Sequence, residues 1–376
     1  MPIQILGTAN ANEWLAILSR VRQHDFHHLP QYHRVAEERG DGKAHLFVYA
    51  EGEYTIALPL LLRPVDATLP DGWLDATSVY GYGGPIASHE NMPPEIVRGF
   101  QADLTDLLRE RAVVTVFSRL HPLIPHQEIL TGIGECPVDG TTLSIDLTSS
   151  DEEQRARYTK NCRTSLRKLK DAGFVGVHDH EKRYLPEFVE IYRETMRRVG
   201  ALSSYFFDQS YFDLLTQELG NTSHLFVALK DGIVASASIC TICGGVAQDH
   251  LGGTRTEFLK FSPDRLVVDT ARVWARGAGA RTYHLGGGVG AQIDSVFKYK
   301  TGFTTRTHTF STFRWVLRPD VYEELSASAA RANEANGREP TSARFFPAYR
   351  CPTRPRVEPP PPAMAVTDIA STIHRE

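Results

Sequence analysis

The chain has 376 residues, of which 41% are hydrophobic and 23% charged, and this composition excludes a largely disordered protein. The formal net charge of -4 excludes attraction of nucleic acid by the molecule as a whole, so such a partner must bind a local basic patch. The five cysteines are scattered, the first residues show no basic region followed by a long apolar run, and no apolar run approaches about 18 residues. These features predict a cytoplasmic protein without integral membrane contact and leave its oligomeric state unknown.

The first third of the chain predicts one unit of mixed secondary structure. Residues 45–65 have the β-branched and aromatic composition of two strands that meet in a turn at Gly52. Apolar residues at helical spacing predict a helix over 95–112, and short apolar stretches predict strands over 113–120 and 141–148.

After Asp146 the pattern starts again. A helix is expected over 151–172, and Ser262 followed by Pro263 supplies the N-cap and first residue of another helix over 262–279. The remaining predicted elements are strands over 174–178, 223–230, 233–242, 245–252, 281–285 and 307–318 and helices over 184–199 and 208–219.

The repeated pattern predicts an α+β fold of two tandem units, whose mixed and largely antiparallel sheets are flanked by helices. We expect an N-terminal domain over 1–146 and a C-terminal domain over 147–335. Proline-rich composition predicts a mobile tail over 336–376.

Four glycines follow a short strand in HLGGGVG, at positions 286, 287, 288 and 290. Their spacing loosely fits the dinucleotide fingerprint, but that motif belongs to a first βαβ unit and opens a long helix. We therefore interpret these glycines as letting the backbone approach a bound substrate or a neighbouring strand, with a flexible connection as the alternative.

Charged and aromatic residues come directly after the glycines. They form a cluster suited to binding a phosphate or a developing oxyanion, and comprise Asp294, Lys298, Tyr299 and Lys300.

A basic stripe is predicted on the helix that opens the second unit. Cations recur at spacings of three and four, at Lys160, Arg163, Arg167 and Lys170. The opposite face is apolar, so the helix should be docked with its cations outward. A solvated charged face is the alternative, but few acids balance the stripe, which makes it the candidate local patch.

Two loop segments at predicted strand ends are further candidates. SVYGYGGP contains Tyr82 among glycines, and FSRLHPL ends a strand with Arg119 and His121. Structural turns are the alternative for the glycines and prolines. Arg119 has the charge needed to bind an anionic ligand.

Metal binding is not predicted. Cys240 and Cys243 form a lone CxxC within a predicted strand, which favours core packing over a zinc site. The histidines of HDFHHLPQYH resemble a metal cluster only in number, and we assign no function to them.

Five segments in order resemble the FemABX-like branch of the GNAT acyltransferase superfamily. The resemblance covers roughly residues 20 to 318, and it is carried by YGYGGP (80–85), RLHPL (119–123), NCRTSLRKLKDAG (161–173), YRETMRRVGA (192–201) and FKYKTGF (297–303). It implies two tandem GNAT-like units. It also implies transfer of an aminoacyl group from aminoacyl-tRNA to an amine acceptor, on a cell-wall precursor or on a small-molecule metabolite.

The resemblance also implies roles for individual residues. In the family, the lysine of an F-K-x-G-F segment lines the acyl-transfer site, and Lys300 matches it, so we assign it to charge stabilisation. Asp249 or Asp294 would accept the amine proton, although Asp249 stands where relatives carry tyrosine, and this leaves the acceptor open. Donor phosphates would bind Lys160, Arg163 and Arg167, and the other expected substrate-binding residues are Tyr82, Arg119, His121, Tyr205, Tyr211, Gly287, Lys298 and Tyr299.

The start of the helix predicted over 262–279 distinguishes between acyl donors. CoA-dependent GNAT enzymes bind pyrophosphate with amides at this helix N-terminus, whereas Pro263 has no N–H and Asp264 would repel phosphate. We therefore expect aminoacyl-tRNA as the co-substrate and no further cofactor. The alternatives are an acyl-CoA-dependent N-acetyltransferase and a non-catalytic binding module of the same fold.

Overall fold

The structure, a computed structural model, describes residues 3–65, 72–124, 126–339, 342 and 345–353. The chain divides into two compact units, Met1–Arg318 and Pro319–Glu376. The second unit contains helix α10 (Pro319–Ala335) and a single 3-10 turn (Ala348–Arg350) among its described residues. Residues 354–376 of the predicted tail lie outside the described part of the chain, so its mobility stays a prediction.

Apart from the helix predicted over 151–172, the predicted elements of the unit Met1–Arg318 are confirmed, with small shifts at their ends. In its first half the order is β1 (Gln4–Leu6), α1 (Ala11–Leu18), α2 (Pro30–Glu38), β2 (Lys43–Glu51), β3 (Tyr54–Pro64), β4 (Leu74–Thr77), β5 (Ile86–Ala87), α3 (Pro94–Glu110), β6 (Val113–Arg119) and β7 (Val138–Asp146). The second half continues with α4 (Asp151–Ala156), α5 (Lys160–Asp171), β8 (Phe174–Asp179), α6 (Leu185–Arg198), α7 (Gln209–Leu219), β9 (Ser223–Lys230), β10 (Ile233–Cys243), β11 (Val246–Thr254), α8 (Asp264–Gly277), β12 (Thr282–Gly286), α9 (Ser295–Lys300) and β13 (Thr307–Val316).

The strands form one continuous mixed sheet, which confirms the predicted α+β class. Its order is β1-β2-β3-β4-β6-β13-β7-β12-β11-β10-β9-β8, and β5 pairs with β3. Two pairs are parallel, β4 with β6 and β11 with β12, and the other pairs of described strands are antiparallel.

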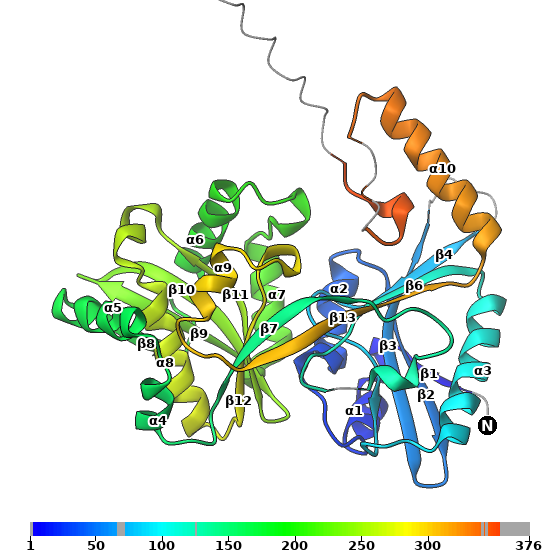
Figure 1. Cartoon of the computed structure of the whole chain (residues 1–376), viewed down its shortest axis with the longest axis horizontal. Coiled ribbons are helices and arrows are strands. Elements are labelled where there is room, and N and C mark those ends of the chain that lie inside the picture. Colours follow the sequence, from blue (N-terminus) through cyan, green and yellow to red (C-terminus); the bar gives the residue numbers. More distant parts are fainter. Residues whose placement is uncertain (1–2, 66–71, 125, 340–341, 343–344, 354–376) are drawn as a thin grey trace, which may run out of the picture. The chain divides into compact units, whose positions relative to one another are not determined.

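Strand β13 joins the two halves of the sheet (Figure 1). Its first residues, 307–311, pair with β7, whereas residues 312–316 pair with β6. Strand β7 in turn pairs with β12, so it belongs to the second half of the sheet although it precedes the expected boundary at residue 146. That boundary stays a prediction, since both halves lie within the unit Met1–Arg318.

Helices cover both faces of the sheet, and three hydrophobic clusters fill the layers. One cluster packs α1 and α2 together with α6 and α7, and therefore links the two halves through residues such as Trp14, Val35, Phe188 and Leu215. Helix α3 packs on the first half, and α5 and α8 pack on the second. This burial of apolar surface is the main favourable term that holds the two halves together.

The single helix expected over 151–172 is wrong, because the chain breaks between α4 and α5. Tyr158 turns inward and its hydroxyl donates to Asp269 Oδ1 (3.0 Å), 111 residues away in the sequence. Thr159 then caps α5 by accepting from the amide of Cys162 (3.3 Å). Arg163 Nη1 donates to the carbonyl oxygen of Ala156 (3.0 Å), which satisfies a carbonyl at the end of α4.

A small correction applies at the start of α8. Ser262 is not the N-cap: it has φ +54, in the left-handed region, and Pro263 occupies the cap position.

Arg272 fixes α4 against α8 from a completely buried position. Its guanidinium donates to Asp269 Oδ1 (3.0 Å) and to Gln154 Oε1 (2.6 Å), and it pairs with Asp151 Oδ1 (2.6 Å). A buried guanidinium is tolerated because each of these acceptors lies within hydrogen-bond distance.

Replacing Arg272 by alanine should lower the free energy of unfolding by about 3 kcal/mol, because it removes one of the cationic partners of the buried Asp269 carboxylate and two hydrogen bonds to it. Urea denaturation measures the change. Arg276 is the matched control, since it is exposed on the same helix and donates only to the carbonyl of Ser149. Equal losses for the Arg272→Ala and Arg276→Ala variants would contradict the assignment.

Candidate active site

Lys300 is the residue of α9 that faces the glycine-rich loop. Its Nζ donates a hydrogen bond to the carbonyl oxygen of Gly287 (2.6 Å). Successive helical residues point about 100° apart, so the neighbours of Lys300 face elsewhere. Lys298 is exposed, and Tyr299 packs against Phe303 and lies under the guanidinium of Arg265 (5.2 Å). Of the four residues predicted to cluster here, Lys300 and Asp294 contact the loop.

Glycines make room for this arrangement. Gly286 has φ +74, and a Cβ atom there would lie 3.2 Å from Tyr82 Oη and 3.4 Å from Lys300 Nζ. A Cβ at Gly287 would lie 2.9 Å from the carbonyl oxygen of Thr141 in β7. The expected close approach to a neighbouring strand is therefore confirmed, and the loop also brings Tyr82 near Lys300.

The two expected proton acceptors have different surroundings. Asp249, in β11, accepts a hydrogen bond from the hydroxyl of Ser238 (2.6 Å). Burial raises the pKa of Asp249, and the positive charge of Lys300 acts against that rise. Burial lowers the pKa of Lys300, and Asp249 counteracts this in turn. The two groups therefore interact through their charges.

Asp294 is the N-cap of α9. Its side chain accepts from the amides of Phe297 (2.8 Å) and Val289 (3.0 Å). Burial acts to raise the pKa of Asp294, but these amides outweigh it and hold the pKa below its ordinary value. Its oxygens are thus used in holding the loop and the helix together.

A group of buried histidines surrounds Tyr82. Of these histidines, only His121 was selected from the sequence. The ring of Tyr82 lies 4.9 Å from that of His284, 5.7 Å from that of His27 and 6.2 Å from that of His121. His27 and His121 both contact Asp25 Oδ2, at 2.8 and 2.9 Å. The high density of histidines in HDFHHLPQYH was the only sequence signal for this group, and it was not sufficient because His121 and His284 come from distant segments.

Arg119 also lies near this group, at the end of β6. It is half-buried, and its guanidinium lies over the ring of Phe117 (5.4 Å). Burial raises the pKa of Tyr82 to about 12, whereas the amide of Gly287 and the charge of Arg119 act to lower it.

Tyr205, in a 3-10 turn before α7, and Tyr211, on α7, belong to an aromatic group that Tyr80 and His250 connect to His27. The ring of Tyr205 lies 5.9 Å from that of Tyr80, and Tyr211 stacks on Phe207 at 4.1 Å. A pocket of about 380 Å³ is lined by residues that include Tyr211, Phe207 and Arg39. Both predicted tyrosines thus face an aromatic surface rather than the Lys300 loop.

The basic stripe of α5 has the expected orientation. Lys160, Arg163 and Arg167 are exposed, while Cys162 and Leu166 are buried on the opposite face. Arg163 also donates to main-chain carbonyls of the preceding turn, and therefore has a structural role.

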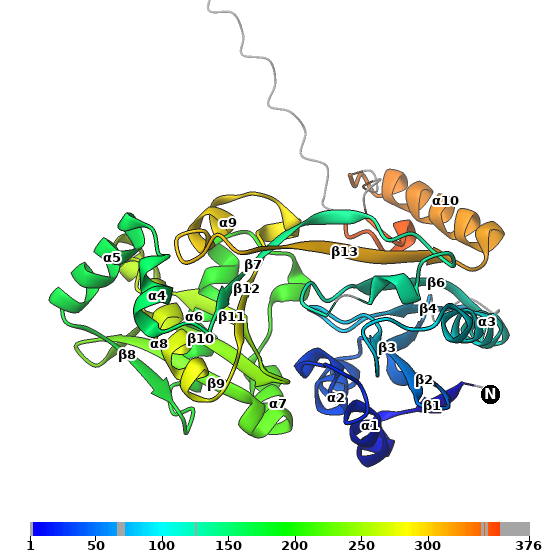
Figure 2. The same cartoon turned by 60° about the horizontal axis from the view of Figure 1, so that its bottom comes forward.

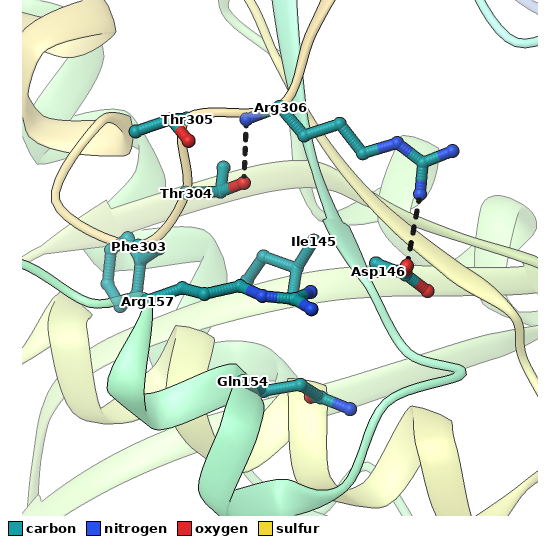
Figure 3. A pocket seen from close by; sticks show the side chains of 8 residues that line it. All are labelled: Ile145, Asp146, Gln154, Arg157, Phe303, Thr304, Thr305 and Arg306. Carbon is teal, nitrogen blue, oxygen red and sulfur yellow. Dashed lines mark hydrogen bonds and ion pairs between the residues drawn. The ribbon is translucent and has the colours of Figure 1, made fainter.

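A polar pocket of about 290 Å³ is lined by Arg157, which precedes α5, and by residues of two distant segments, 145–146 and 303–306 (Figure 3). Arg157 extends into it from the segment that connects α4 to α5. Arg306 lines the pocket from another segment and pairs with Asp146 at 3.8 Å. Neither arginine was selected from the sequence, because the pocket forms only when these separate segments meet.

Comparison with known proteins places these features in a family context. Residues 156–301 match the family described as an acetyltransferase (GNAT) domain. No curated protein sequence matches the chain. Within the described residues, none of the helices is both long enough and apolar enough to cross a membrane.

Two solved structures share the fold. The crystal structure of FemX aligns with a TM-score of 0.68 and 16% identity, over 86% of this chain and 99% of FemX. L-PGS from Bacillus licheniformis aligns with a TM-score of 0.53 and 13% identity, over 84% of this chain and 94% of that one. Residues 156–301 thus match an acetyltransferase (GNAT) domain, and the chain has a FemX-like fold, in agreement with the resemblance to the FemABX-like branch of the GNAT superfamily.

Proposed function

We propose that this protein is an N-acyltransferase that moves an aminoacyl group from aminoacyl-tRNA to an amine acceptor in the cytoplasm. The observation that carries the proposal is the position of Lys300, whose ammonium is held by the Gly287 carbonyl beside Tyr82 at the centre of the sheet. The GNAT-domain match and the FemX-like fold support acyl transfer as the reaction class.

The reaction requires stabilisation of negative charge. An amine attacks the ester carbonyl, and the carbonyl oxygen becomes an oxyanion in the tetrahedral intermediate. A cation in a partly desolvated site interacts with such an oxyanion more strongly than one in water. Lys300 fits this role, since it is half-buried and already positioned by the Gly287 carbonyl. Asp249 would help to keep it charged.

The N-terminus of α8 supports a donor other than CoA. The amide of Arg265 donates to the carbonyl of Ser262 (3.2 Å), and the amides of Leu266 and Val267 donate to that of Pro263 (3.0 and 3.3 Å). Amides engaged in this way are not available to bind a pyrophosphate. The carboxylate of Asp264, in the first turn, would in addition repel it.

The surface beside α5 is suited to the phosphates of a tRNA acceptor end. Lys160 and Arg167 are exposed on α5, and Arg157 and Arg306 line the neighbouring pocket. Cations spaced along a surface attract a phosphate backbone without reading its sequence. We assign the donor to this surface.

The amine acceptor would enter near Tyr82. Arg119 and His121 lie close to this tyrosine, and Tyr211 lines a pocket of about 380 Å³ that offers a further surface for the acceptor. An acceptor with an anionic group would be favoured by Arg119.

Lys300→Ala should reduce the rate of aminoacyl transfer at least about 100-fold, because the oxyanion loses its charge partner. The assay uses purified protein, charged tRNA and a panel of amines, with the amide product measured by mass spectrometry. Lys298→Ala is the matched control, since Lys298 lies on the same helix and is exposed.

Transfer that survives in the Lys300→Ala variant at the level of the Lys298→Ala control would contradict the site. Acylation by wild-type protein with acetyl-CoA and no tRNA would instead favour the CoA-dependent alternative.

Lys160→Ala combined with Arg167→Ala should weaken binding of aminoacyl-tRNA and reduce the slope of log K against log salt by about 2, one for each lost phosphate contact. Fluorescence anisotropy over a salt series measures both quantities. Arg98→Ala with Arg109→Ala is the control, because these exposed arginines lie on α3 in the other half of the sheet. An equal reduction in both double variants would remove the support for a tRNA surface on α5.

A further inference from the structure

We propose that His284 is the proton acceptor for the attacking amine, through its Nε2 atom. This inference rests on the proposed acyl transfer and adds a catalytic residue to it. Sequence reasoning did not select His284, which comes directly before the glycine-rich loop in β12.

The tautomer of His284 follows from its neighbours. Gln248 Nε2 donates to the carbonyl oxygen of Asp249 (2.8 Å), which orients the amide so that Gln248 Oε1 faces His284. His284 Nδ1 lies 2.6 Å from that oxygen. An amide oxygen only accepts, so Nδ1 carries the proton and the neutral ring has its lone pair on Nε2.

That lone pair lacks a partner. His284 is 0% exposed, and its Nε2 makes no hydrogen bond with any described residue. A buried polar atom without a partner costs free energy and is uncommon in folded proteins. The His284 ring lies next to Tyr82, which we expect to bind substrate, so Nε2 could accept a proton from a bound amine.

The position of His284 fits this use. Strand β12 lies between β7 and β11 at the centre of the sheet (Figure 2). The centre of the His284 ring lies 4.9 Å from that of Tyr82, and a Cβ atom at Gly286, two residues later, would lie within 3.4 Å of both Tyr82 Oη and Lys300 Nζ. His284 directly precedes the glycine-rich loop, and Lys300, on α9, binds the carbonyl of Gly287 in that loop.

His27 and His121, the other two histidines whose rings lie near Tyr82, both bind Asp25. His121 Nδ1 accepts from the amide of Leu123 (3.1 Å), so the His121 proton lies on Nε2 and is donated to Asp25 Oδ2. The same oxygen accepts from His27 Nδ1. Asp25, His27 and His121 lie close enough to hold a metal ion, but with the His121 proton on the ligating nitrogen they form a hydrogen-bonded group.

The proposed step balances as follows. The amine nitrogen attacks the ester carbon and forms the C–N bond, while Lys300 stabilises the oxyanion. The extra proton passes from nitrogen to His284 Nε2. Collapse of the intermediate breaks the C–O bond, and His284 returns the proton to the ribose oxygen that leaves. The products are the amide and the deacylated tRNA, and His284 is again neutral.

The surroundings keep His284 in the accepting form. Burial lowers the pKa of His284 well below its ordinary value, and electrostatic interactions with His121, His308, Lys300 and His27 act in the same direction. The neutral ring therefore persists as the pH falls through 6.5, the ordinary pKa of histidine. Tyr82 and Gln248, which also face the ring, stay uncharged in this range.

The test compares transfer rates of wild-type protein with those of His284→Gln and His284→Ala between pH 6 and 9. We expect a loss of at least about 100-fold in kcat for both variants, with little change in KM. The ratio of variant to wild-type rate should rise with pH, since hydroxide replaces the lost base. Imidazole added to His284→Ala should restore part of the rate. His308→Gln is the control, because His308 lies 6.5 Å away and contacts Ser144.

Rates of the His284 variants within about 3-fold of the control would overturn the inference. The inference would also be overturned if imidazole did not restore the rate of His284→Ala and the ratio of variant to wild-type rate stayed constant with pH. Both results are expected of a residue with a structural role. If the His284 variants do not fold, Gln248→Leu decides: it removes the hydrogen bond that fixes the tautomer, and an unchanged kcat counts against the inference. Absence of transfer in the wild type is a separate result, which rejects the proposed function itself.

Discussion

The hydrogen bond from Lys300 Nζ to the carbonyl oxygen of Gly287 is the contact on which the site depends. It fixes a flexible cationic side chain at one point, and it requires the backbone at 286 and 287 to approach Tyr82 and β7 more closely than a side chain would allow. A lysine in this position is partly removed from water and so gives up solvation. Asp249 and the carbonyl of Gly287 offset that loss. The ammonium is then in position to stabilise the negative charge that would develop on the ester carbonyl oxygen.

The fold places this contact where the two halves of the sheet meet. Strand β13 passes from β7 to β6, and Tyr82, His27 and His121 come from the first half whereas His284 and Lys300 come from the second. Neither half contains all of these groups. The shared strand and the apolar cluster between α2 and α7 are therefore part of what positions the chemistry, since they hold the two sets of side chains at contact distance.

The periodic parts of the molecule could be predicted from the sequence, because local spacing determines them. The amphipathic face of α5 is one case, and the strand pairs around Gly52 are another. The break before α5 could not be predicted from the sequence, because it depends on a hydrogen bond between Tyr158 and Asp269, which is distant in the sequence. Similarly, FKYKTGF pointed to Lys300, but Lys298 and Tyr299 face elsewhere once 295–300 is a helix. The role of His284 depends on Gln248, which no local pattern indicates.

The central claim is that Lys300 is a partly desolvated cation whose charge is supported by Asp249. An NMR titration of lysine side chains, with Lys300 assigned by its loss in Lys300→Arg, tests this most directly. We expect a pKa for Lys300 below the ordinary 10.5, because burial lowers it, and a further decrease in Asp249→Asn, because a supporting negative charge is lost. A Lys300 that titrates together with exposed lysines in both proteins would contradict it.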